Sequence, residues 1–599
     1  MNISTRPAEG NSKFARDAWL RALANTAAIA ETGDTLPIVI DRLAVRFGDA
    51  PALIDSETEM TFRGLSLRAN QYARFGLLQG LRQGDEVALM MSNCAEYVAV
   101  WLGLTRIGVV VALVNSQLSG AALLHSINVA NPKAVIVGAD LAPRVTAVRG
   151  RLPAAIACFV HGAAIENFAE LSPLLAALSG EPLQPGERAP PSIDAIALYI
   201  YTSGTTGLSK AAKVSHYRLM QWSYWFAGML ETTAQDRMYN CLPLYHSVGG
   251  VVATFAPLVN GGAVVIRPRF SATEFWRDLR AERCTLFQYI GELCRYLVNS
   301  PHQAIETEHT LRMVCGNGLR PEVWEAFQNR FRIARILEYY ASTEGNFSLY
   351  NCEGQIGAIG RIPPFLANRL PVALLRFDVE SAQPARNAEG RCERCGPNEV
   401  GEAVGLIPDG AQRGGRFEGY ADAEASARKV LRDVFKEGDA WYRTGDLMRR
   451  DERGFFYFVD RVGETYRWKG ENVSTAEVLT ALTATRGVLE GVVYGVAVPG
   501  ADGRAGMAAL VVSREFDLGE FRRCIAERLP AYARPVFLRL IPSLEATGTF
   551  KPRKQDLAAA GFDPSRISDP LFFDDARAKA YVPLDGAVFA NIAAGAIRV

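Results

Sequence analysis

The stretch that most constrains this chain of 599 residues lies at residues 199–212, where a short apolar and aromatic run leads into glycines, hydroxyl side chains and one lysine. Glycine lets backbone N–H groups turn toward an anion, hydroxyl groups add donors, and Lys210 adds a positive charge. The stretch therefore predicts a strand followed by a phosphate-binding loop. A Walker A loop has four residues between its two glycines, whereas Gly204 and Gly207 have only two between them. A plain flexible loop is the alternative, and the preceding strand and the lysine argue against it.

Length and composition point to an ordinary globular protein of more than one domain. A chain of 599 residues is too long for a single core, and its 49% apolar and 22% charged content exclude wholesale disorder. The 65 basic and 64 acidic residues give a net charge of +1, so we expect no nucleic-acid partner. The ten cysteines show no disulfide spacing, and Cys392 and Cys395 form one C-x2-C pair without a second pair of zinc ligands nearby. We therefore expect reduced cysteines and an intracellular protein.

Two apolar segments could be mistaken for membrane spans. Residues 98–114 contain Arg106 at their middle, and residues 247–266 contain a proline and polar residues, whereas a span needs about 20 clean apolar residues. Both are better interpreted as buried helices or strands. The polar start of the chain, residues 1–16, lacks the apolar core of a signal peptide. We expect a cytoplasmic protein, and a peripheral contact at the inner face of a membrane stays open.

The order of apolar patterns predicts an α/β fold. Short apolar runs alternate with helical patterns over residues 52–160, and further strands are expected at residues 238–242, 263–266, 286–289, 312–315 and 335–339. Glycine, proline and turn pairs dominate residues 355–460, which predicts a β-rich subdomain. We therefore expect a large N-terminal domain of stacked α/β layers over residues 1–460, which includes the β-rich subdomain, and a small α+β domain over residues 461–599.

Five further motifs follow the loop along the chain, and each contains charged, hydroxyl or amide side chains. They are Tyr340-Ala-Ser-Thr-Glu344, Tyr442-Arg-Thr-Gly-Asp446, Val459-Asp-Arg461, Lys469-Gly-Glu-Asn472 and Thr547-Gly-Thr-Phe-Lys551. With the loop and these motifs in this order, the chain resembles the adenylate-forming enzymes. These include acyl-CoA synthetases, peptide-synthetase adenylation domains and firefly-type luciferases. Residues 466–475, 548–551, 581–585 and 592–599 resemble the fatty acid transport protein and very-long-chain acyl-CoA synthetase branch.

The resemblance implies a site for ATP with Mg²⁺. Phosphate transfer needs donors, cations and Mg²⁺ rather than a protein nucleophile, and Mg²⁺ prefers oxygen ligands. A hydroxyl beside a carboxylate suits this chemistry, so Thr343 is expected to contact phosphate and Glu344 to bind the metal. Asp446 with Arg461 is expected to hold the ribose, although an isolated Thr-Gly-Asp is more often a plain turn. The expected ATP-binding residues are Thr202, Ser203, Gly204, Thr205, Thr206, Gly207, Lys210, Gly316, Asn317, Gly318, Tyr339, Tyr340, Asp446 and Arg461.

Among the expected ATP-binding residues, Tyr339, Tyr340 and the glycines on either side of Asn317 would form a flat slot for adenine. Core packing is the alternative for the two tyrosines. In the family, the lysine that matches Lys551 reaches the acyl carboxylate and the α-phosphate. Residues 461–464 match the segment about which relatives rotate the small domain, and Gly463 can absorb a large change in φ and ψ. Arg467 is then expected to face the thioester-forming half-reaction.

The acyl chain is expected to enter near His246, which matches a position that gates the acyl pocket in relatives. Val248 and Gly249 begin a segment of small and apolar residues that suits a tunnel for an alkyl chain. A histidine with a purely structural role and ordinary core packing explain the same residues equally well.

These observations predict an ATP-dependent fatty acyl-CoA synthetase that acts on long or very long chains. It would form an acyl-adenylate and pyrophosphate, then acyl-CoA and AMP, with coenzyme A as co-substrate. A ligase for another hydrophobic acid, of the steroid or bile type, and a ligase that loads carrier-protein pantetheine are alternatives. A fatty-acid uptake or binding protein with weak catalysis is the alternative of a different class. The sequence leaves a homodimer open.

Overall fold

The computed structural model describes residues 9–599 except 185, 203–208, 379–380, 409–414, 470, 500, 502, 545–553 and 598, and leaves the side chains of 9–11, 471, 472 and 555 undescribed. The chain divides into two compact units. The first comprises Met1–Leu370 and Leu406–Leu431, and the second comprises Pro371–Gly405 and Arg432–Val599. This division follows contacts within the chain. The predicted boundary at residue 460 separates the large domain from a small domain that is expected to rotate. It stays a prediction.

Two sheets form the framework of the described part of the first unit. One sheet has seven strands in the order β7-β6-β5-β3-β4-β8-β9, parallel except for β8 with β9. Its strands are β3 (Glu86–Met90), β4 (Val110–Leu113), β5 (Ala134–Gly138), β6 (Ala157–His161), β7 (Ala169–Glu170), β8 (Ile196–Thr202) and β9 (Lys210–Ser215). The final antiparallel pair reverses the chain, so the predicted phosphate loop connects β8 to β9.

The second sheet of this unit has eight strands in the order β15-β14-β13-β12-β10-β11-β1-β2, parallel except at its two edges. Its strands are β1 (Pro51–Ile54), β2 (Glu59–Thr61), β10 (Arg237–Asn240), β11 (Ala263–Ile266), β12 (Leu286–Ile290), β13 (Met313–Asn317), β14 (Ile336–Tyr340) and β15 (Leu349–Asn351). The strands expected from the apolar runs between residues 238 and 339 are confirmed within two residues at each end.

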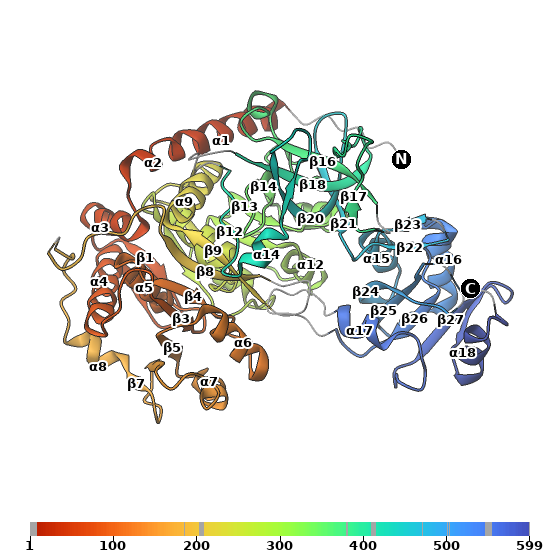
Figure 1. Ribbon diagram of the computed structural model, residues 1–599, viewed down its shortest axis with the longest axis horizontal. Coiled ribbons are helices and arrows are strands. Elements are labelled where there is room, and N and C mark those ends of the chain that lie inside the picture. The colour runs from red at the N-terminus through yellow and green to blue at the C-terminus, as the bar shows by residue number, and fades with distance from the viewer. Residues whose placement is uncertain are drawn as a thin grey trace. The chain divides into compact units, whose positions relative to one another are not determined.

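Helices cover both sheets, and α4 and α5 lie beside one another next to β3 and β4 (Figure 1). The helices of this unit are α1 (Glu9–Ala27), α2 (Ile29–Thr32), α3 (Leu36–Phe47), α4 (Phe62–Leu78), α5 (Ala95–Arg106), α6 (Gly120–Ala130), α7 (Ala142–Arg149), α8 (Leu171–Ala176), α9 (His216–Leu230), the π-helix η1 (Val248–Ala253), α10 (Thr254–Leu258), α11 (Phe275–Ala281), α12 (Gly291–Asn299), α13 (Pro321–Arg330), the 3₁₀ turn η2 (Pro364–Leu366) and α14 (Ala423–Ala427). One hydrophobic core joins both sheets to α3, α4, α5, α9 and α10, with Trp101 of α5, Val111 of β4 and Val264 of β11 all fully buried.

The two apolar runs that resemble membrane spans are interior elements. Residues 98–114 form most of α5 and β4, and residues 247–266 form η1, α10 and β11. Within the described residues, we find no helix that combines the length and the apolar character needed to cross a membrane. The interpretation of both runs as buried elements is confirmed.

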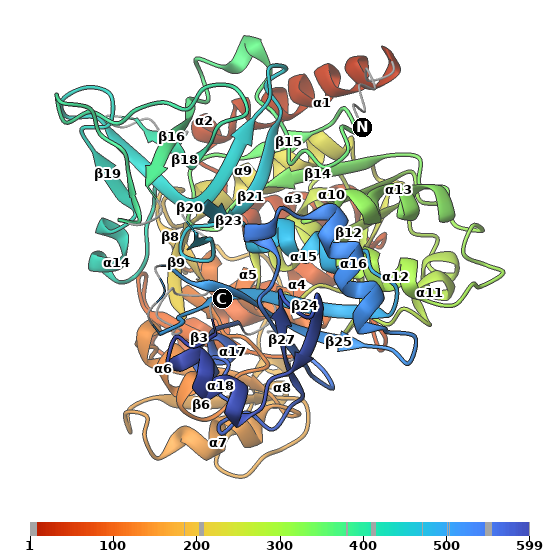
Figure 2. The same ribbon diagram turned by 90° about the vertical axis from the view of Figure 1, so that its right-hand side faces the viewer.

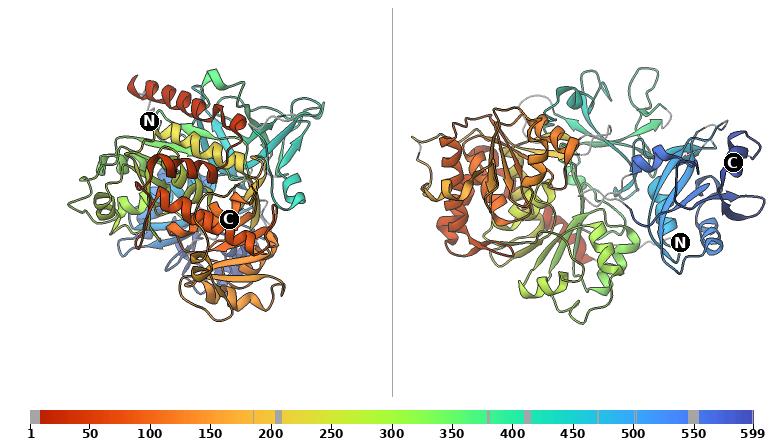
Figure 3. Two further views of the ribbon diagram at one scale, coloured as in Figure 1. Left: turned by 90° about the vertical axis from the view of Figure 1, so that its left-hand side faces the viewer. Right: turned by 90° about the horizontal axis from the view of Figure 1, so that it is seen from below.

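The first helix packs along α9, far from it in sequence (Figure 3). Trp19 of α1 is 1% exposed, and its ring makes edge-to-face contacts with Trp225 of α9 at 5.6 Å and with Tyr350 of β15 at 5.3 Å. A glycine permits this approach, because a Cβ atom at Gly228 would lie 2.6 Å from the backbone nitrogen of Ala22. The helix is therefore part of the core of the first unit.

The second unit combines a β-rich part with a small α+β part. Its six-stranded sheet runs β17-β16-β18-β20-β19 with β21 paired to β20, followed by the ribbon β22-β23 and the five-stranded sheet β24-β25-β26-β27-β28, as far as the chain is described. The strands are β16 (Val372–Asp378), β17 (Gln383–Pro384), β18 (Val400–Ile407), β19 (Val430–Arg432), β20 (Ala440–Arg450), β21 (Phe456–Arg461), β22 (Tyr466–Trp468), β23 (Glu471–Val473), β24 (Val488–Val496), β25 (Ala505–Val512), β26 (Phe537–Leu540), β27 (Leu571–Asp575) and β28 (Ala580–Pro583).

Helices pack on the five-stranded sheet around a separate core, and Figure 2 shows α15 and α16 beside it. The helical elements are α15 (Thr475–Thr483), α16 (Leu518–Arg528), the 3₁₀ turn η3 (Ala531–Ala533), α17 (Lys554–Ala560) and α18 (Gly586–Ala593). Together the two units give the predicted α/β fold class: large α/β layers, a β-rich subdomain and a small α+β part. The mobility of the small domain stays a prediction.

Replacing Gly228 with alanine should destabilise the protein, although alanine normally favours a helix. The new Cβ would meet the backbone of α1 at 2.6 Å, and overpacking of this kind costs about 1–3 kcal/mol. Chemical unfolding would measure the loss. Gly150→Ala is the control, because a Cβ there meets nothing within 4 Å and the backbone is helical. Equal stabilities of the two variants would contradict the described packing of α1.

Candidate functional site

The ends of the predicted phosphate loop are held by one helix. The Tyr201 hydroxyl, at the end of β8, donates to the Ser126 carbonyl at 2.5 Å, and the Ser126 hydroxyl lies 2.9 Å from the Ser209 hydroxyl. His125 Nε2 lies 3.1 Å from the Ser209 carbonyl. Consecutive residues of α6 therefore contact the chain on both sides of the loop. Ser203, Gly204, Thr205, Thr206 and Gly207 lie outside the described residues, so their expected phosphate contacts stay predictions.

The other predicted nucleotide residues of the first unit follow parallel strands of the eight-stranded sheet. Gly318 follows β13, Tyr340 ends β14 and His246 follows β10. Because β10, β12, β13 and β14 are parallel, their carboxyl ends meet at one edge, which is where open α/β sheets bind ligands. This topology brings Gly316, Asn317, Tyr340, Thr343 and Glu344 to the same edge.

Tyr420 connects that edge to the phosphate loop. Its hydroxyl donates to Glu344 Oε1 at 2.8 Å, and Lys210 Nζ lies 5.7 Å from the centre of its ring. The Thr343 hydroxyl lies 3.1 Å from the Ser247 hydroxyl. The side chain of Tyr420 therefore contacts both Lys210, at the start of β9, and Glu344, after the end of β14.

Strand pairing fixes the position of Tyr420. Residues 419–421 run antiparallel along β9, where the Lys213 N–H donates to the Gly419 carbonyl at 2.9 Å and the Ala421 N–H donates to the Ala211 carbonyl at 2.8 Å. Burial, followed by the charge of Glu344, raises the pKa of the Tyr420 hydroxyl well above its usual value, although a hydrogen bond with Thr202 acts in the opposite direction. The hydroxyl therefore stays protonated and donates to the carboxylate.

A buried arginine supports the backbone of the same motif. Arg218 of α9 is 6% exposed and donates to the carbonyls of Thr343 at 3.0 Å and Arg416 at 2.7 Å. Glu418 lies 3.6 Å from Arg218 and accepts hydrogen bonds from the Ser215 N–H at 2.8 Å and from its hydroxyl at 2.5 Å. The strand that carries Tyr420 and the turn that carries Glu344 are thus tied to the start of α9.

The oxygen donors at this edge suit Mg²⁺. Among the described residues no group of three or more His, Cys, Asp and Glu side chains gathers as a metal cage. Mg²⁺ is usually bound by one or two carboxylates together with substrate phosphates and water, so Glu344 beside a phosphate loop fits its chemistry. A carboxylate accepts several partners, and the bond from Tyr420 is compatible with a cation.

The two tyrosines expected at adenine lie differently. Tyr339 is 2% exposed and packs against Phe226 at 4.8 Å and Tyr350 at 6.3 Å, within an aromatic cluster of the core. Tyr340, the next residue of β14, points to the opposite face, where its ring lies 6.0 Å from that of Phe347. The packing alternative therefore describes the surroundings of Tyr339, and the adenine contact of Tyr340 stays a prediction.

The expected acyl segment begins in a π-helix, a feature often found at functional sites. A Cβ atom at Gly249 would lie 2.4 Å from the Pro243 carbonyl, so only glycine permits this packing. The Gly249 carbonyl accepts hydrogen bonds from Asn240 at 2.9 Å and Thr254 at 2.8 Å. His246 precedes Val248 and the π-helix, with its ring 4.6 Å from that of Tyr245. The gating role of His246 stays a prediction.

In the second unit, Asp446 and Arg461 face one another on neighbouring strands. They are register partners of β20 and β21, and Arg461 Nε lies 3.4 Å from Asp446 Oδ1. The Thr444 hydroxyl donates to the Ala403 carbonyl at 2.7 Å, and the Asp446 N–H donates to that hydroxyl at 3.0 Å. The pair that the motifs predict for ribose is therefore brought together.

The expected hinge is a turn after β21. Gly463 has a φ of +87°, which favours glycine, and a Cβ there would meet nothing within 4 Å. Lys554 Nζ lies 2.6 Å from Glu464 Oε2 in this turn. Arg467 lies on β22, where its carbonyl accepts from the Arg504 N–H at 2.7 Å. Lys551 lies outside the described residues, so its role stays a prediction.

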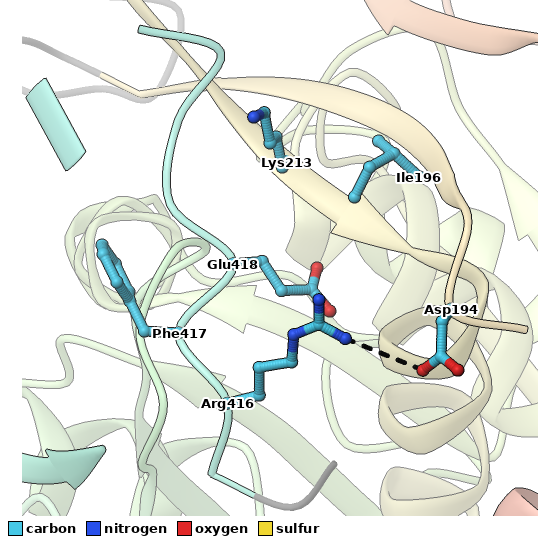
Figure 4. A pocket seen from close by; sticks show the side chains of 6 residues that line it. All are labelled: Asp194, Ile196, Lys213, Arg416, Phe417 and Glu418. Carbon is cyan, nitrogen blue, oxygen red and sulfur yellow. Dashed lines mark ion pairs between the residues drawn. The ribbon is translucent and has the colours of Figure 1, made fainter. Parts of the chain in front are cut away.

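A cavity of about 290 Å³ opens between residues 416–418 and the strands β8 and β9 (Figure 4). Its charged lining residues are Asp194, Lys213, Arg416 and Glu418, and Arg416 Nη1 lies 3.7 Å from Asp194 Oδ1. Two positive and two negative side chains favour neither an anion nor a cation. We assign no ligand to this cavity.

Sequence reasoning missed Tyr420, Ser126, His125 and Arg218. All four lie far along the chain from the residues they contact, and none belongs to the motifs from which the phosphate site is predicted. The only local signal was the Gly419-Tyr420 pair within a glycine-rich stretch.

Comparisons with known proteins identify the family of the chain. A family model described as AMP-binding enzyme matches residues 40–371. Long-chain fatty acid transport protein 1 of Mus musculus is 40% identical over 575 residues, covering 94% of this chain and 88% of that protein. Long-chain fatty acid transport protein 3 of Mus musculus is 41% identical over 528 residues, covering 87% of this chain and 78% of that protein.

Solved structures share the fold at lower identity. An anthranilate CoA ligase in complex with anthranoyl-AMP superposes with a TM-score of 0.75 at 20% identity, covering 88% of this chain and 97% of that chain. A fatty acyl CoA synthetase of Mycobacterium tuberculosis superposes with a TM-score of 0.61 at 21% identity, covering 88% of this chain and 98% of that chain.

Tyr420→Phe should weaken the binding of ATP with Mg²⁺ by about tenfold or more, because a hydrogen bond to a charged group contributes about 1.5–3 kcal/mol. The ring and its contact with Lys210 would remain. Isothermal titration calorimetry with and without Mg²⁺ would measure the effect. Tyr199→Phe on β8 is the control, since its ring packs in a separate core cluster. An unchanged affinity in Tyr420→Phe would show that Tyr420 does not orient Glu344.

Proposed function

Because the chain belongs to the AMP-binding enzyme family and is 40% identical to a long-chain fatty acid transport protein, we propose that it is an ATP-dependent fatty acyl-CoA synthetase for long or very long chains. The observation that carries the proposal is the contact of Tyr420 with both Lys210 and Glu344. A protein that only binds fatty acid has no need for a lysine and a carboxylate held beside a phosphate loop.

In the first half-reaction, an oxygen of the fatty acid carboxylate attacks the α-phosphorus of ATP, and pyrophosphate leaves. Lys210 and the loop before it would neutralise the β- and γ-phosphates. Glu344 would hold Mg²⁺, which supplies positive charge to the leaving pyrophosphate, and Thr343 would contact phosphate. Asp446 and Arg461 would bind the ribose, and Lys551 would contact the acyl carboxylate and the α-phosphate.

In the second half-reaction, the thiolate sulfur of coenzyme A attacks the acyl carbonyl, and AMP leaves. Rotation at residues 461–464 would replace Lys551 with the face that carries Arg467, and the open surroundings of Gly463 suit such a movement. His246, Val248 and Gly249 would line the entry of the alkyl chain. The proposal places the protein in the cytoplasm, in contact with the inner face of a membrane that supplies the acid.

The direct test of the reaction is pyrophosphate release with ATP and Mg²⁺ across acids from short to very long, with and without coenzyme A. We expect release to peak with long chains and acyl-CoA to form only when coenzyme A is present. Release with a steroid-type acid alone would move the proposal to the ligase alternative. Fatty-acid binding without any ATP turnover would favour the uptake protein.

Lys551→Ala should abolish acid-dependent pyrophosphate release and leave ATP binding within about threefold of the wild type, because the lysine is proposed to act on the reacting groups rather than on ATP as a whole. Lys579→Ala, in the turn before β28, is the matched control and should retain full activity. Adenylation at a near-normal rate in Lys551→Ala would remove that lysine from the mechanism.

A further inference from the structure

A buried carboxyl group lies directly behind the expected adenine loop. Glu338 of β14 is 2% exposed, and its Oε2 atom lies 2.5 Å from the Tyr289 hydroxyl of β12. Its Oε1 atom accepts a hydrogen bond from the Leu319 N–H at 3.1 Å, and the Gly318 N–H also donates to the carboxyl. The backbone N–H groups of Gly318 and Leu319, which follow β13, therefore both donate to this one side chain.

The loop has little room to move in this arrangement. A Cβ atom at Gly316 would lie 2.3 Å from the Tyr289 carbonyl, and one at Gly291 would lie 1.9 Å from the Gly318 carbonyl. Gly318 has a φ of +77°, in the region that favours glycine. The loop is thus confined by β12, by the start of α12 and by Glu338.

We propose that Glu338 is a positioning residue for nucleotide binding, which holds residues 316–318 in the conformation that accepts adenine. This inference rests on the proposed function, since that function places adenine at this loop. Glu338 is buried behind the loop and acts through its backbone.

The surroundings keep this carboxyl group neutral near pH 7. Burial raises the pKa of Glu338 to about 8, and the hydrogen bonds from Tyr289, Leu319 and Gly318 only partly oppose that shift. The titratable groups that face it are Tyr289, Cys294, Cys315 and Tyr339, and burial raises the pKa of each, so all four are uncharged. Within the described residues no Lys or Arg forms an ion pair with Glu338.

Ionisation at higher pH would place an uncompensated charge in this interior. A buried charge without a partner is costly, so the ionised side chain would favour loop conformations in which water reaches it. Those conformations would no longer present the adenine slot. We therefore expect ATP affinity to fall above the pKa of Glu338.

Equilibrium binding of ATP between pH 6.5 and pH 9 tests the inference with three variants. In wild type the dissociation constant should rise by up to about tenfold between pH 7 and pH 9. In Glu338→Gln it should stay within about twofold across this range, since the amide reproduces the hydrogen bonds of the neutral acid. In Glu338→Ala it should be raised about tenfold or more at every pH, since the Leu319 N–H loses its acceptor. Glu306→Gln, which breaks a buried ion pair with Arg330 away from the loop, should keep the wild-type profile.

Parallel losses of affinity in wild type and Glu338→Gln above pH 8 would overturn the inference, as would wild-type affinity in Glu338→Ala. The binding assay is independent of catalysis. If the wild type binds ATP with the expected pH dependence but releases no pyrophosphate with any acid, the proposed reaction fails and the role of Glu338 stands.

Thermal unfolding gives a second readout. The pKa of Glu338 is about 8 in the folded protein against an ordinary value of 4.5, so its stabilising contribution is complete below about pH 4.5 and is lost as pH rises to about 8. The amide of Glu338→Gln does not ionise, so this variant does not lose stability in this way as pH rises. The melting temperature of Glu338→Gln minus that of the wild type should therefore increase from pH 5 to pH 8 and then stay constant. A difference that does not change with pH would show that Glu338 is ionised in the folded protein, which would overturn the neutral form on which the inference depends.

Discussion

The hydrogen bond from Tyr420 to Glu344 joins two sheets that the chain builds separately. The lysine that ends the predicted phosphate loop begins β9 of the seven-stranded sheet, and the carboxylate follows β14 of the eight-stranded sheet. Neither sheet alone holds both groups. A short segment near residue 420 pairs with β9 and places one aromatic side chain between them, so its backbone pairing sets the distance between cation and carboxylate.

The same principle recurs around the nucleotide residues. The His125 side chain lies against the Ser209 carbonyl after the predicted phosphate loop, Arg218 holds the Thr343 carbonyl, and Glu338 holds the chain after β13. In each case a side chain from a regular element binds backbone groups of a connecting segment. The conformation of the predicted nucleotide-binding segments therefore depends on side chains of the regular elements behind them.

Much of this could be predicted from the sequence, for a physical reason. Apolar runs and motif order identified the strands of the eight-stranded sheet, and the turn after Tyr340 follows from the end of β14. Tyr420 and Ser126 could not be found in this way, because their roles depend on which distant segments meet in space. Tyr339 shows the same limit: alternation along β14 puts it on the opposite face from Tyr340, and the motif alone does not say which face each residue occupies.

The packing of α1 against α9 and β15 has a consequence for the synthesis of the chain. Trp19 is synthesised long before its partners Trp225 and Tyr350, which follow it far along the chain. Until α9 has been made, the apolar face of α1 lacks the helix that covers it, and the contact with Tyr350 must wait for β15. Contacts between residues so distant in sequence form slowly. The nascent chain must therefore carry the apolar face of this helix uncovered while the intervening residues are made, and transiently exposed apolar surface of this kind is the reason that chaperones are needed.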